Sequence, residues 1–315
     1  MASKKKRLIK EWRKKARAHK GTALSERTRT AYADQWRRFS EWCEEYGESP
    51  LPSSGELVAA YFVARVEDGW RVSSLSQALA AICHEHTAAG HPTPRSDPEF
   101  VEVWQGLRKS MVARPTQKTP LSVDWLREML EVLPEGTRGC RDRAILTIGF
   151  AGAFRRSELA NLLVEDVQFH PQGVELLVRK SKSDQTSKGH VKVIAYGQNP
   201  ATCPVRALEA WLELAGLVEG PIFRPVDRHE NVRDRAITPH SIAKVVKDSA
   251  ARAGLDPTQF SGHSLRAGFV TTATLNGAPE AAVMDQSGHR SVEMLRRYTR
   301  RVDAWQKPAS AKLGL

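Results

Sequence analysis

The sequence is poor in cysteine and has no long apolar run. Its cysteines, Cys43, Cys83, Cys140 and Cys203, lie far apart, so we expect a reducing compartment and no disulfide framework. The longest stretch without a charged or strongly polar side chain is Ala144–Phe154, whereas a membrane-spanning helix needs about 20 residues. The basic N-terminus contains no apolar segment typical of secretory signals. These absences exclude a membrane protein and favour a cytoplasmic one.

Acidic residues are scarce at one end of the chain. The 315 residues carry 48 Lys/Arg and 36 Asp/Glu, a net charge of +12, and residues 1–20 alone hold ten basic side chains and one acidic one. A basic tail on a nearly balanced body predicts contact with a polyanion such as nucleic acid. A solubilising tail has the same composition. The K-K-K-R run is also typical of a nuclear-import signal, so this choice stays open.

Apolar periodicity predicts a helical domain over residues 21–112, after the tail of residues 1–20. Side chains recur at helical spacing in four segments, each bounded by a capping residue or a glycine. Residues 113–120, A-R-P-T-Q-K-T-P, have two prolines and little apolar surface, so they are interpreted as a linker. The four helices are expected from Ser25 to Gly47, from Ser54 to Gly69, from Ser73 or Ser74 to Ala89, and from Asp97 to Met111.

Residues 121–315 predict a mixed domain. Alternating strands are expected at 167–169, 174–178 and 191–195, with a turn at 171–173 and a long polar loop at 180–189. The fold class is therefore mainly α: an all-α four-helix domain followed by an α+β domain with a small antiparallel sheet. The remaining segments read as helices, starting at Ser122 and Ser157 and covering about 141–154, 204–215, 239–253, 263–276, 279–287 and 292–298.

Polar residues that can do chemistry gather in the second domain. His263 and Arg266 are three residues apart and share a helix face. His289 follows another helix, Tyr298 lies nine residues later, and Arg155 comes directly after an apolar helix. No carboxylates cluster beside them. Arginine forks bind two oxygens of one phosphate, histidine transfers protons and tyrosine can act as a nucleophile. This set indicates phosphate chemistry without a metal or other cofactor.

At this point the residues resemble a known family. The pattern G-x-x-R-x-S-E-L at 152–159, a lysine between two strands, H-x-L-R at 263–266, G-H at 288–289 and a tyrosine nine residues further on resemble the tyrosine recombinases, the phage integrase family. The joint pattern is specific, whereas H-x-L-R alone is weak. The resemblance covers residues 21–315, and the plan is similar to that of the simple two-domain Cre-type recombinases.

The resemblance implies a role for each residue. Tyr298 would attack the scissile phosphate, forming a 3′-phosphotyrosyl link and releasing a 5′-hydroxyl. Arg155 and Arg266 would hold the non-bridging oxygens, and Lys182 would protonate the leaving 5′ oxygen. ATP is not required, because the phosphotyrosyl link retains the bond energy. The remaining implied roles are proton transfer with Tyr298 for His263, a bond to the phosphate for His289, and an ion pair with Arg155 for Glu158.

Three positions leave alternatives open, and a fourth departs from the family pattern. Arg156 follows Arg155 where the family usually has an aliphatic residue, so the register can be read one place later; S-E-L favours Arg155. Glu158 can instead be a surface carboxylate at a helix start. Ser287 stands where leucine is more usual. The lysine is chosen from Lys180, Lys182 and Lys188, and the S-K-S-D context favours Lys182.

The family plan implies the partners. Two domains would close around duplex DNA with short inverted-repeat sites, and four copies would act together on paired sites. Residues 303–315 would either dock on a neighbouring copy or be a frayed end. A 20-residue tail is too short for a separate arm-binding domain. Accessory proteins, the target sequence and the direction of recombination are not predicted. The exposed basic residues that we expect to contact DNA phosphates are Arg29, Arg37, Arg38, Arg71, Arg108, Lys109 and Arg156.

Other functions remain as alternatives. A DNA-bound regulator that has lost its chemistry would be expected to lose some of the motif residues, and they are all present. A hydrolytic nuclease normally needs a metal and clustered carboxylates. A type IB topoisomerase shares the chemistry, but the motif spacing favours a recombinase. The run Cys83-His84-Glu85-His86 predicts no metal site, because its two histidines project to different faces of a helix.

Overall fold

The computed structural model describes residues 9, 11–12, 24–111, 118–179, 189–289 and 291–295. The chain divides into two compact units, Met1–Pro115 and Thr116–Leu315, each considered by itself. Most of the predicted linker and of the basic tail lies outside the described residues. Within the described part, no helix combines the length and apolar character needed to cross a membrane.

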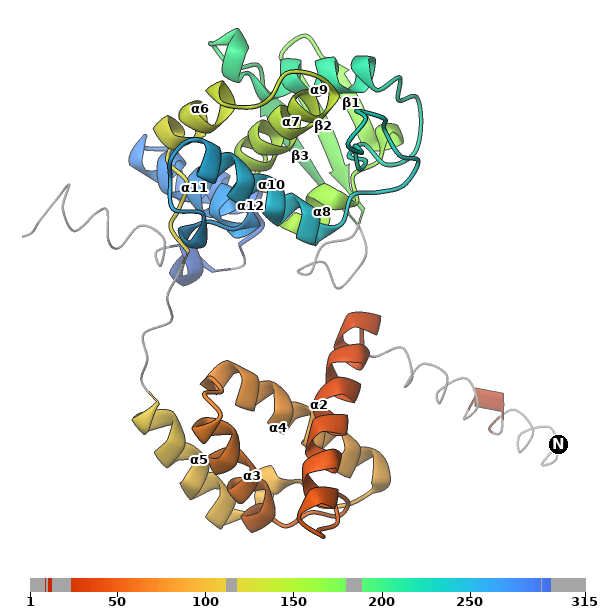
Figure 1. Cartoon of the computed structure of the whole chain (residues 1–315), viewed down its shortest axis with the longest axis vertical. Helices are drawn as coiled ribbons and strands as arrows, with labels where there is room; N and C mark the ends of the chain where they lie inside the picture. Colours follow the sequence, from red (N-terminus) through yellow and green to blue (C-terminus); the bar gives the residue numbers. More distant parts are fainter. Residues whose placement is uncertain are drawn as a thin grey trace, which may run out of the picture. The chain divides into compact units, whose positions relative to one another are not determined.

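The N-terminal unit consists of helices around an aromatic core (Figure 1). Phe39, Tyr61, Phe62 and Phe100 are all almost completely buried, and their rings meet in tilted or edge-to-face pairs. The four predicted helices are confirmed, and the third starts one residue before the predicted serines. They are α2 (Glu26–Glu45), α3 (Gly55–Glu67), α4 (Val72–Ala89) and α5 (Pro98–Ser110), with the short 3-10 helix η1 (Pro94–Ser96) before α5.

Local capping explains these boundaries. The side chains of Ser25, Ser54 and Asp97 accept hydrogen bonds from the first turns of α2, α3 and α5. His86 is a buried core residue: its Nε2 lies 3.0 Å from the backbone nitrogen of Ser53, and its Nδ1 lies 2.9 Å from the Ile82 carbonyl oxygen. The ring thereby ties α4 to the segment that precedes α3.

The C-terminal unit is the predicted α+β domain. Its sheet is antiparallel in the order β1 (Val167–His170), β2 (Gly173–Val178) and β3 (His190–Ala195), as expected. Figure 1 shows the strands at one side of the unit and α6 and α11 at the other. The helices are α6 (Val123–Glu131), α7 (Thr137–Ala151), α8 (Arg156–Ala160), α9 (Pro204–Leu214), α10 (Pro239–Arg252), α11 (Gly262–Leu275) and α12 (Glu280–Ser287), with short 3-10 helices at 164–166, 200–202 and 257–259.

One predicted helix was wrong at both ends. The apolar run predicted a helix over 141–154, whereas α7 starts at Thr137 and ends at Ala151. The chain leaves the helix because Ala153 adopts a left-handed conformation, with φ 49°, and Phe154 turns back. A side chain at Gly152 would lie 2.1 Å from the Phe154 ring, so this turn needs glycine there. The tight turn brings Arg155 to the start of α8.

Close packing fixes α11 against the rest of the unit. A Cβ atom at Gly268 would lie 2.1 Å from the Leu121 carbonyl oxygen and 2.7 Å from the Phe150 ring. On α7, a Cβ atom at Gly149 would lie 2.8 Å from the Leu265 side chain. The two glycines therefore allow α11 to approach its neighbours directly, which fixes the helix that carries His263 and Arg266.

Gly268→Ala tests this close approach. The added methyl group meets a backbone oxygen that cannot move freely, so we expect the free energy of unfolding of the C-terminal unit to fall by about 1–3 kcal/mol. Urea denaturation, followed by hydrogen exchange in each unit, measures the loss. Gly106→Ala in α5 is the control, because a Cβ atom there meets nothing within 4 Å; it should be neutral or stabilising. Equal effects of the two substitutions would contradict the packing argument.

Candidate active site

The turn between α7 and α8 presents Arg155 and holds it in place. Arg155 is the N-cap of α8, and its backbone N–H donates to the Glu158 Oε2 atom at 2.9 Å. Its guanidinium donates to Glu158 Oε1 at 2.5 Å and to the Gly288 carbonyl oxygen at 3.4 Å. The Arg155 side chain is 23% exposed, while that of Glu158 is buried. The predicted ion pair is present, and it fixes a partly accessible arginine.

Glu158 stays ionised although it is buried. Burial alone would raise the pKa of this carboxyl. The hydrogen bonds from the Arg155 backbone and guanidinium, together with the charges of Arg155 and Lys192, outweigh burial and lower the pKa below its ordinary value of 4.5. The alternative of a surface carboxylate is therefore wrong.

Helix α11 contributes the second arginine and a histidine. Arg266 is 1% exposed, and its Nη1 atom donates to the Ala153 carbonyl oxygen at 3.0 Å, within the turn that leads to Arg155. His263 lies one turn earlier and keeps an exposed edge. Desolvation by the surrounding atoms, followed by the charge of Arg266, lowers the pKa of His263 below its ordinary 6.5. At neutral pH the imidazole is therefore uncharged and can accept a proton.

His289 follows α12 and is held by the end of that helix. Gly288 adopts a left-handed conformation, with φ 64°, and turns the chain so that the His289 backbone N–H donates to the Met284 carbonyl oxygen. Ser287 Oγ lies 2.7 Å from His289 Nδ1 and donates to the Val283 carbonyl oxygen at 2.5 Å. Burial, followed by the charge of Arg266, lowers the pKa of His289 to about 4.

Lys192 lies in the same region, and sequence reasoning missed it. This β3 lysine is 2% exposed, and its Nζ atom donates to the Gly152 carbonyl oxygen at 2.7 Å and to the Gln286 carbonyl oxygen. Burial lowers its pKa to about 8. Its burial follows from its pairing with Leu176, whose side chain lies in the core, and this pairing is not visible in the sequence alone.

Together these residues form a positively charged centre built from separate elements. Arg155 comes from the α7–α8 turn, Arg266 and His263 from α11, His289 from the end of α12 and Lys192 from β3. Among the residues described, no group of three or more His, Cys, Asp or Glu side chains is placed to hold a metal ion. The arrangement of arginines and neutral histidines can bind a phosphate and move protons beside it.

Two predicted catalytic residues lie outside the described residues. Tyr298 is one, and Lys182, with the neighbouring Lys180 and Lys188, is the other. Their roles stay predictions. The observed geometry therefore comprises Arg155, His263, Arg266 and His289, while Tyr298 and Lys182 enter only as proposed members of the site.

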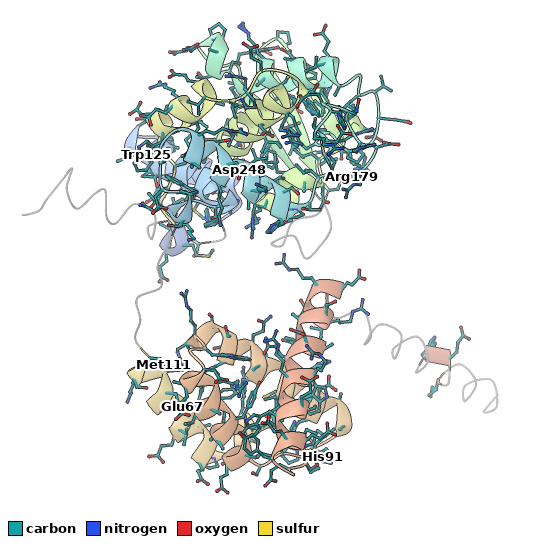
Figure 2. All side chains as sticks on the ribbon, in the orientation of Figure 1. Glu67, His91, Met111, Trp125, Arg179 and Asp248 are labelled. Carbon is teal, nitrogen blue, oxygen red and sulfur yellow. The ribbon has the colours of Figure 1, made fainter. Side chains whose placement is uncertain are left out.

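The predicted DNA-contacting residues are all exposed. Arg37 forms ion pairs with Asp34 and Glu41, and Arg108 lies over the Trp104 ring. Figure 2 shows side chains standing out from the surface of both units. Arg156 is exposed, with its stem over Gly262, where a Cβ atom would come within 2.2 Å. The others, Arg29, Arg38, Arg71 and Lys109, are exposed on the N-terminal unit.

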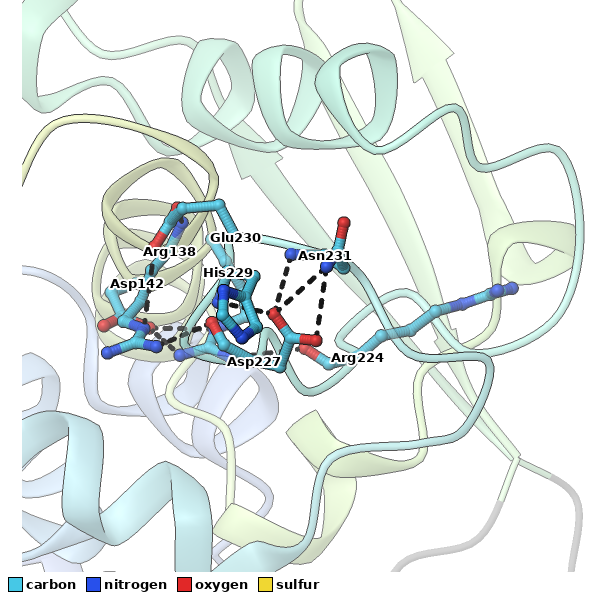
Figure 3. A network of polar contacts seen from close by, with 8 residues as sticks. Arg138, Asp142, Arg224, Asp227, His229, Glu230 and Asn231 are labelled. Atoms are coloured by element: carbon cyan, nitrogen blue, oxygen red, sulfur yellow. Dashed lines mark hydrogen bonds and ion pairs between the residues drawn. The ribbon is translucent and has the colours of Figure 1, made fainter.

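The C-terminal unit also holds a second polar network (Figure 3). Asp227 Oδ1 accepts hydrogen bonds from the backbone N–H groups of His229 and Asn231, which closes a loop. Arg138, at the start of α7, donates to the Asp227 carbonyl oxygen at 2.8 Å, and its backbone N–H donates to Glu230. These contacts attach the loop to α7, so the network has a structural explanation.

Comparisons with known proteins agree with the motif. Residues 120–304 match the phage integrase family. An integrase/recombinase XerD homolog of Selenomonas ruminantium is 35% identical over 288 residues, which cover 90% of this chain and 84% of the relative. The Cre recombinase of Escherichia phage P1 is 23% identical over 304 residues, 90% and 86% of the two chains. The structure of XerH recombinase bound to its palindromic difH substrate has a similar fold, with a TM-score of 0.64 at 16% identity, covering 91% of this chain and 80% of that one.

The lowered pKa of His289 predicts acid sensitivity. Between pH 6.5 and 4 the unfolded chain binds a proton at this residue and the folded chain does not, so stability is lost as the pH falls. From pH 7 to pH 5 the unfolding free energy should fall by about 2 kcal/mol more in the wild type than in His289→Gln. Urea denaturation at the two pH values measures this difference. Parallel losses in both proteins would contradict it.

Ser287 should select the tautomer of His289. Because the single hydroxyl proton of Ser287 goes to the Val283 carbonyl oxygen, His289 Nδ1 is left to donate to Ser287 Oγ and carries the ring proton. ¹⁵N NMR of the imidazole should show protonated Nδ1 in the wild type at pH 7. Ser287→Ala should abolish this preference. A wild-type ring protonated at Nε2 would show that the serine does not act this way.

Proposed function

Because the chain belongs to the phage integrase family, we propose that it is a site-specific DNA recombinase that cleaves and rejoins strands through a 3′-phosphotyrosyl intermediate. The observation that carries the proposal is the convergence of Arg155, Arg266 and His289 from three elements. Two guanidinium groups supply the donors that neutralise the charge on the non-bridging oxygens of a phosphate in its transition state, and the imidazole adds a donor once the phosphate has favoured its protonated form.

In the proposed cleavage step, the Tyr298 hydroxyl oxygen attacks phosphorus and the bond from phosphorus to the 5′ oxygen breaks. The tyrosine proton passes to His263, whose neutral ring at pH 7 suits a general base. Lys182 gives a proton to the leaving 5′ oxygen. Rejoining reverses the step with a new 5′-hydroxyl as nucleophile. In each direction one ester bond to phosphorus breaks and one forms, so the group stays a phosphodiester and neither ATP nor a metal ion enters the balance.

The remaining groups orient this chemistry. Glu158 accepts hydrogen bonds from both the backbone N–H and the guanidinium of Arg155, and these contacts fix the orientation of the guanidinium group. His289 is uncharged in the free protein. A phosphate beside the ring would raise its pKa and favour a donated hydrogen bond to an oxygen.

The proposal includes the partners. We propose that four copies act on paired, short inverted-repeat sites in double-stranded DNA in the cytoplasm. The XerH relative was solved with a palindromic DNA substrate, which supports a symmetric site here. The exposed basic residues on the N-terminal unit, Arg29, Arg37, Arg38, Arg71, Arg108 and Lys109, would contact DNA phosphates, together with Arg156 on the catalytic unit.

Covalent capture tests the proposal. The protein is mixed with fragmented host and flanking DNA and denatured, and the DNA that stays attached is sequenced. We expect adducts at a discrete inverted-repeat site with the wild type and none with Tyr298→Phe, because the phenyl ring lacks the nucleophilic oxygen. Tyr196→Phe is the matched control: Tyr196 directly follows β3 and its hydroxyl donates to Glu209 on α9, so its removal should leave the adduct intact.

Other results would replace the proposal. Adducts scattered over all sequences would indicate a topoisomerase-like activity. Site-specific binding in a gel-shift assay, with no adduct from the wild type, would indicate a DNA-bound regulator. An adduct that persists in Tyr298→Phe would assign the nucleophile to another residue.

A further inference from the structure

A buried lysine on a strand needs an explanation. Lys192 occupies an inward-facing position of β3, opposite Leu176, while its neighbours Val191 and Val193 are 46% and 61% exposed. An apolar side chain at this position would complete the core without the cost of burying an ammonium group. The strand instead exposes two valines and buries a charge, so the lysine has a specific task at that place.

The contacts of Lys192 show what it connects. Its Nζ atom donates to the carbonyl oxygen of Gly152, at the end of α7, and to that of Gln286, in the last turn of α12. The Gln286 side-chain amide joins the same elements, donating to the carbonyl oxygens of Ala151 at 3.2 Å and Val193 at 3.1 Å. Strand β3, the end of α7 and the end of α12 are thus held together around one ammonium group.

Both carbonyl oxygens lie three residues before a residue of the site. Gly152 is followed by the turn that leads to Arg155, and the next carbonyl oxygen, that of Ala153, accepts the hydrogen bond from Arg266. Gln286 is followed by Ser287 and Gly288, which lead to His289. A shift at either carbonyl oxygen would therefore move a group that is proposed to hold the phosphate.

The same contacts separate Lys192 from a proton donor to DNA. Its Nζ atom is engaged by two carbonyl oxygens, lies 4.9 Å from the centre of the Phe154 ring and belongs to a side chain that is 2% exposed. Reaching a leaving oxygen would require both hydrogen bonds to break. A general acid must lie within hydrogen-bond reach of the group that it protonates, whereas the Nζ atom of Lys192 is held by main-chain oxygens.

Charges of both signs face the ammonium group. Burial lowers the pKa of Lys192 to about 8, the Glu158 carboxylate on α8 opposes this, Arg266 and Arg155 lower it further, and Asp285 on α12 raises it. The charge of Lys192 in turn contributes to the lowered pKa values of Glu158 and His289. It is therefore electrostatically coupled to the residues that it holds.

We infer that Lys192 is a positioning residue for the proposed strand cleavage: it ties the turn that carries Arg155 to the helix end that carries His289. The inference rests on the function proposed above. It predicts that removing the ammonium group slows cleavage in the bound complex without preventing folding or DNA binding. The lysine at 182 keeps its separate role as proton donor.

Lys192→Met, which keeps the length of the side chain and removes the charge, tests the inference. The substrate is DNA carrying the site recovered by covalent capture, at saturating concentration. We expect the cleavage rate constant to fall by about 100-fold, because a displacement of catalytic groups by about 1 Å can cost that much. The fraction of protein that eventually reacts should stay unchanged, whereas simple misfolding would lower that fraction. Lys244→Met, which removes a surface lysine paired with Asp248, is the control and should change the rate by no more than about twofold.

A sulfur atom in place of the leaving 5′ oxygen separates positioning from proton donation. A thiolate leaves without a proton, so this substrate should restore the rate of Lys182→Ala and leave Lys192→Met slow. A Lys192→Met rate within about threefold of the wild type would overturn the inference. Restoration of Lys192→Met by sulfur would also overturn it, because it would make Lys192 the proton donor.

Hydrogen exchange tests the tie without DNA. In Lys192→Met, backbone amides at 151–155 and 286–289 should exchange at least about tenfold faster than in the wild type, while α9 stays unchanged. Unchanged exchange in both segments would overturn the inference whatever the fate of the proposed function. Absence of a wild-type adduct, with the exchange result as expected, would instead reject the proposed function alone.

Discussion

The site depends on hydrogen bonds from buried cations to carbonyl oxygens of the main chain. Arg266 donates to Ala153 and Lys192 donates to Gly152, so two adjacent carbonyl oxygens of one turn receive two positive side chains from different elements. Carbonyl oxygens satisfy the donors without cancelling their charge. This differs from the Arg141–Asp142 pair, where a buried carboxylate balances a buried guanidinium. The turn therefore concentrates positive charge instead of neutralising it.

Such a turn constrains the surrounding fold. Ala153 must adopt its left-handed conformation, Gly152 must lack a side chain and Phe154 must fold back over it. Burying several cations near one carboxylate, Glu158, is unfavourable for the free protein, because each loses hydration. A bound phosphate would supply the missing negative charge. The cations that destabilise the free site would therefore be the same ones that attract the proposed polyanion.

Much of this arrangement could be predicted from the sequence. Capping residues and apolar spacing located the helices, and alternation located the three strands, because these signals are local. The early end of α7 was not predictable from the apolar run, since the turn depends on the Phe154 ring packing over Gly152. The ion pair of Arg155 with Glu158 followed from their spacing and the motif.

Lys192 escaped prediction for a related reason. Alternation indicates that a strand has two faces but does not say which face is buried. In β3 the usual inference fails, because Val191 and Val193 are exposed and the lysine lies inside. Only the pairing with Leu176 and the approach of α12 decide the burial, and both are long-range.

The use of main-chain oxygens as anchors has an evolutionary consequence. Every residue type supplies a carbonyl oxygen, so the side chains at many anchor positions can change while the acceptors remain. Selection then acts on the path of the backbone and on a few special positions, such as the glycine at 152, rather than on matched pairs of side chains.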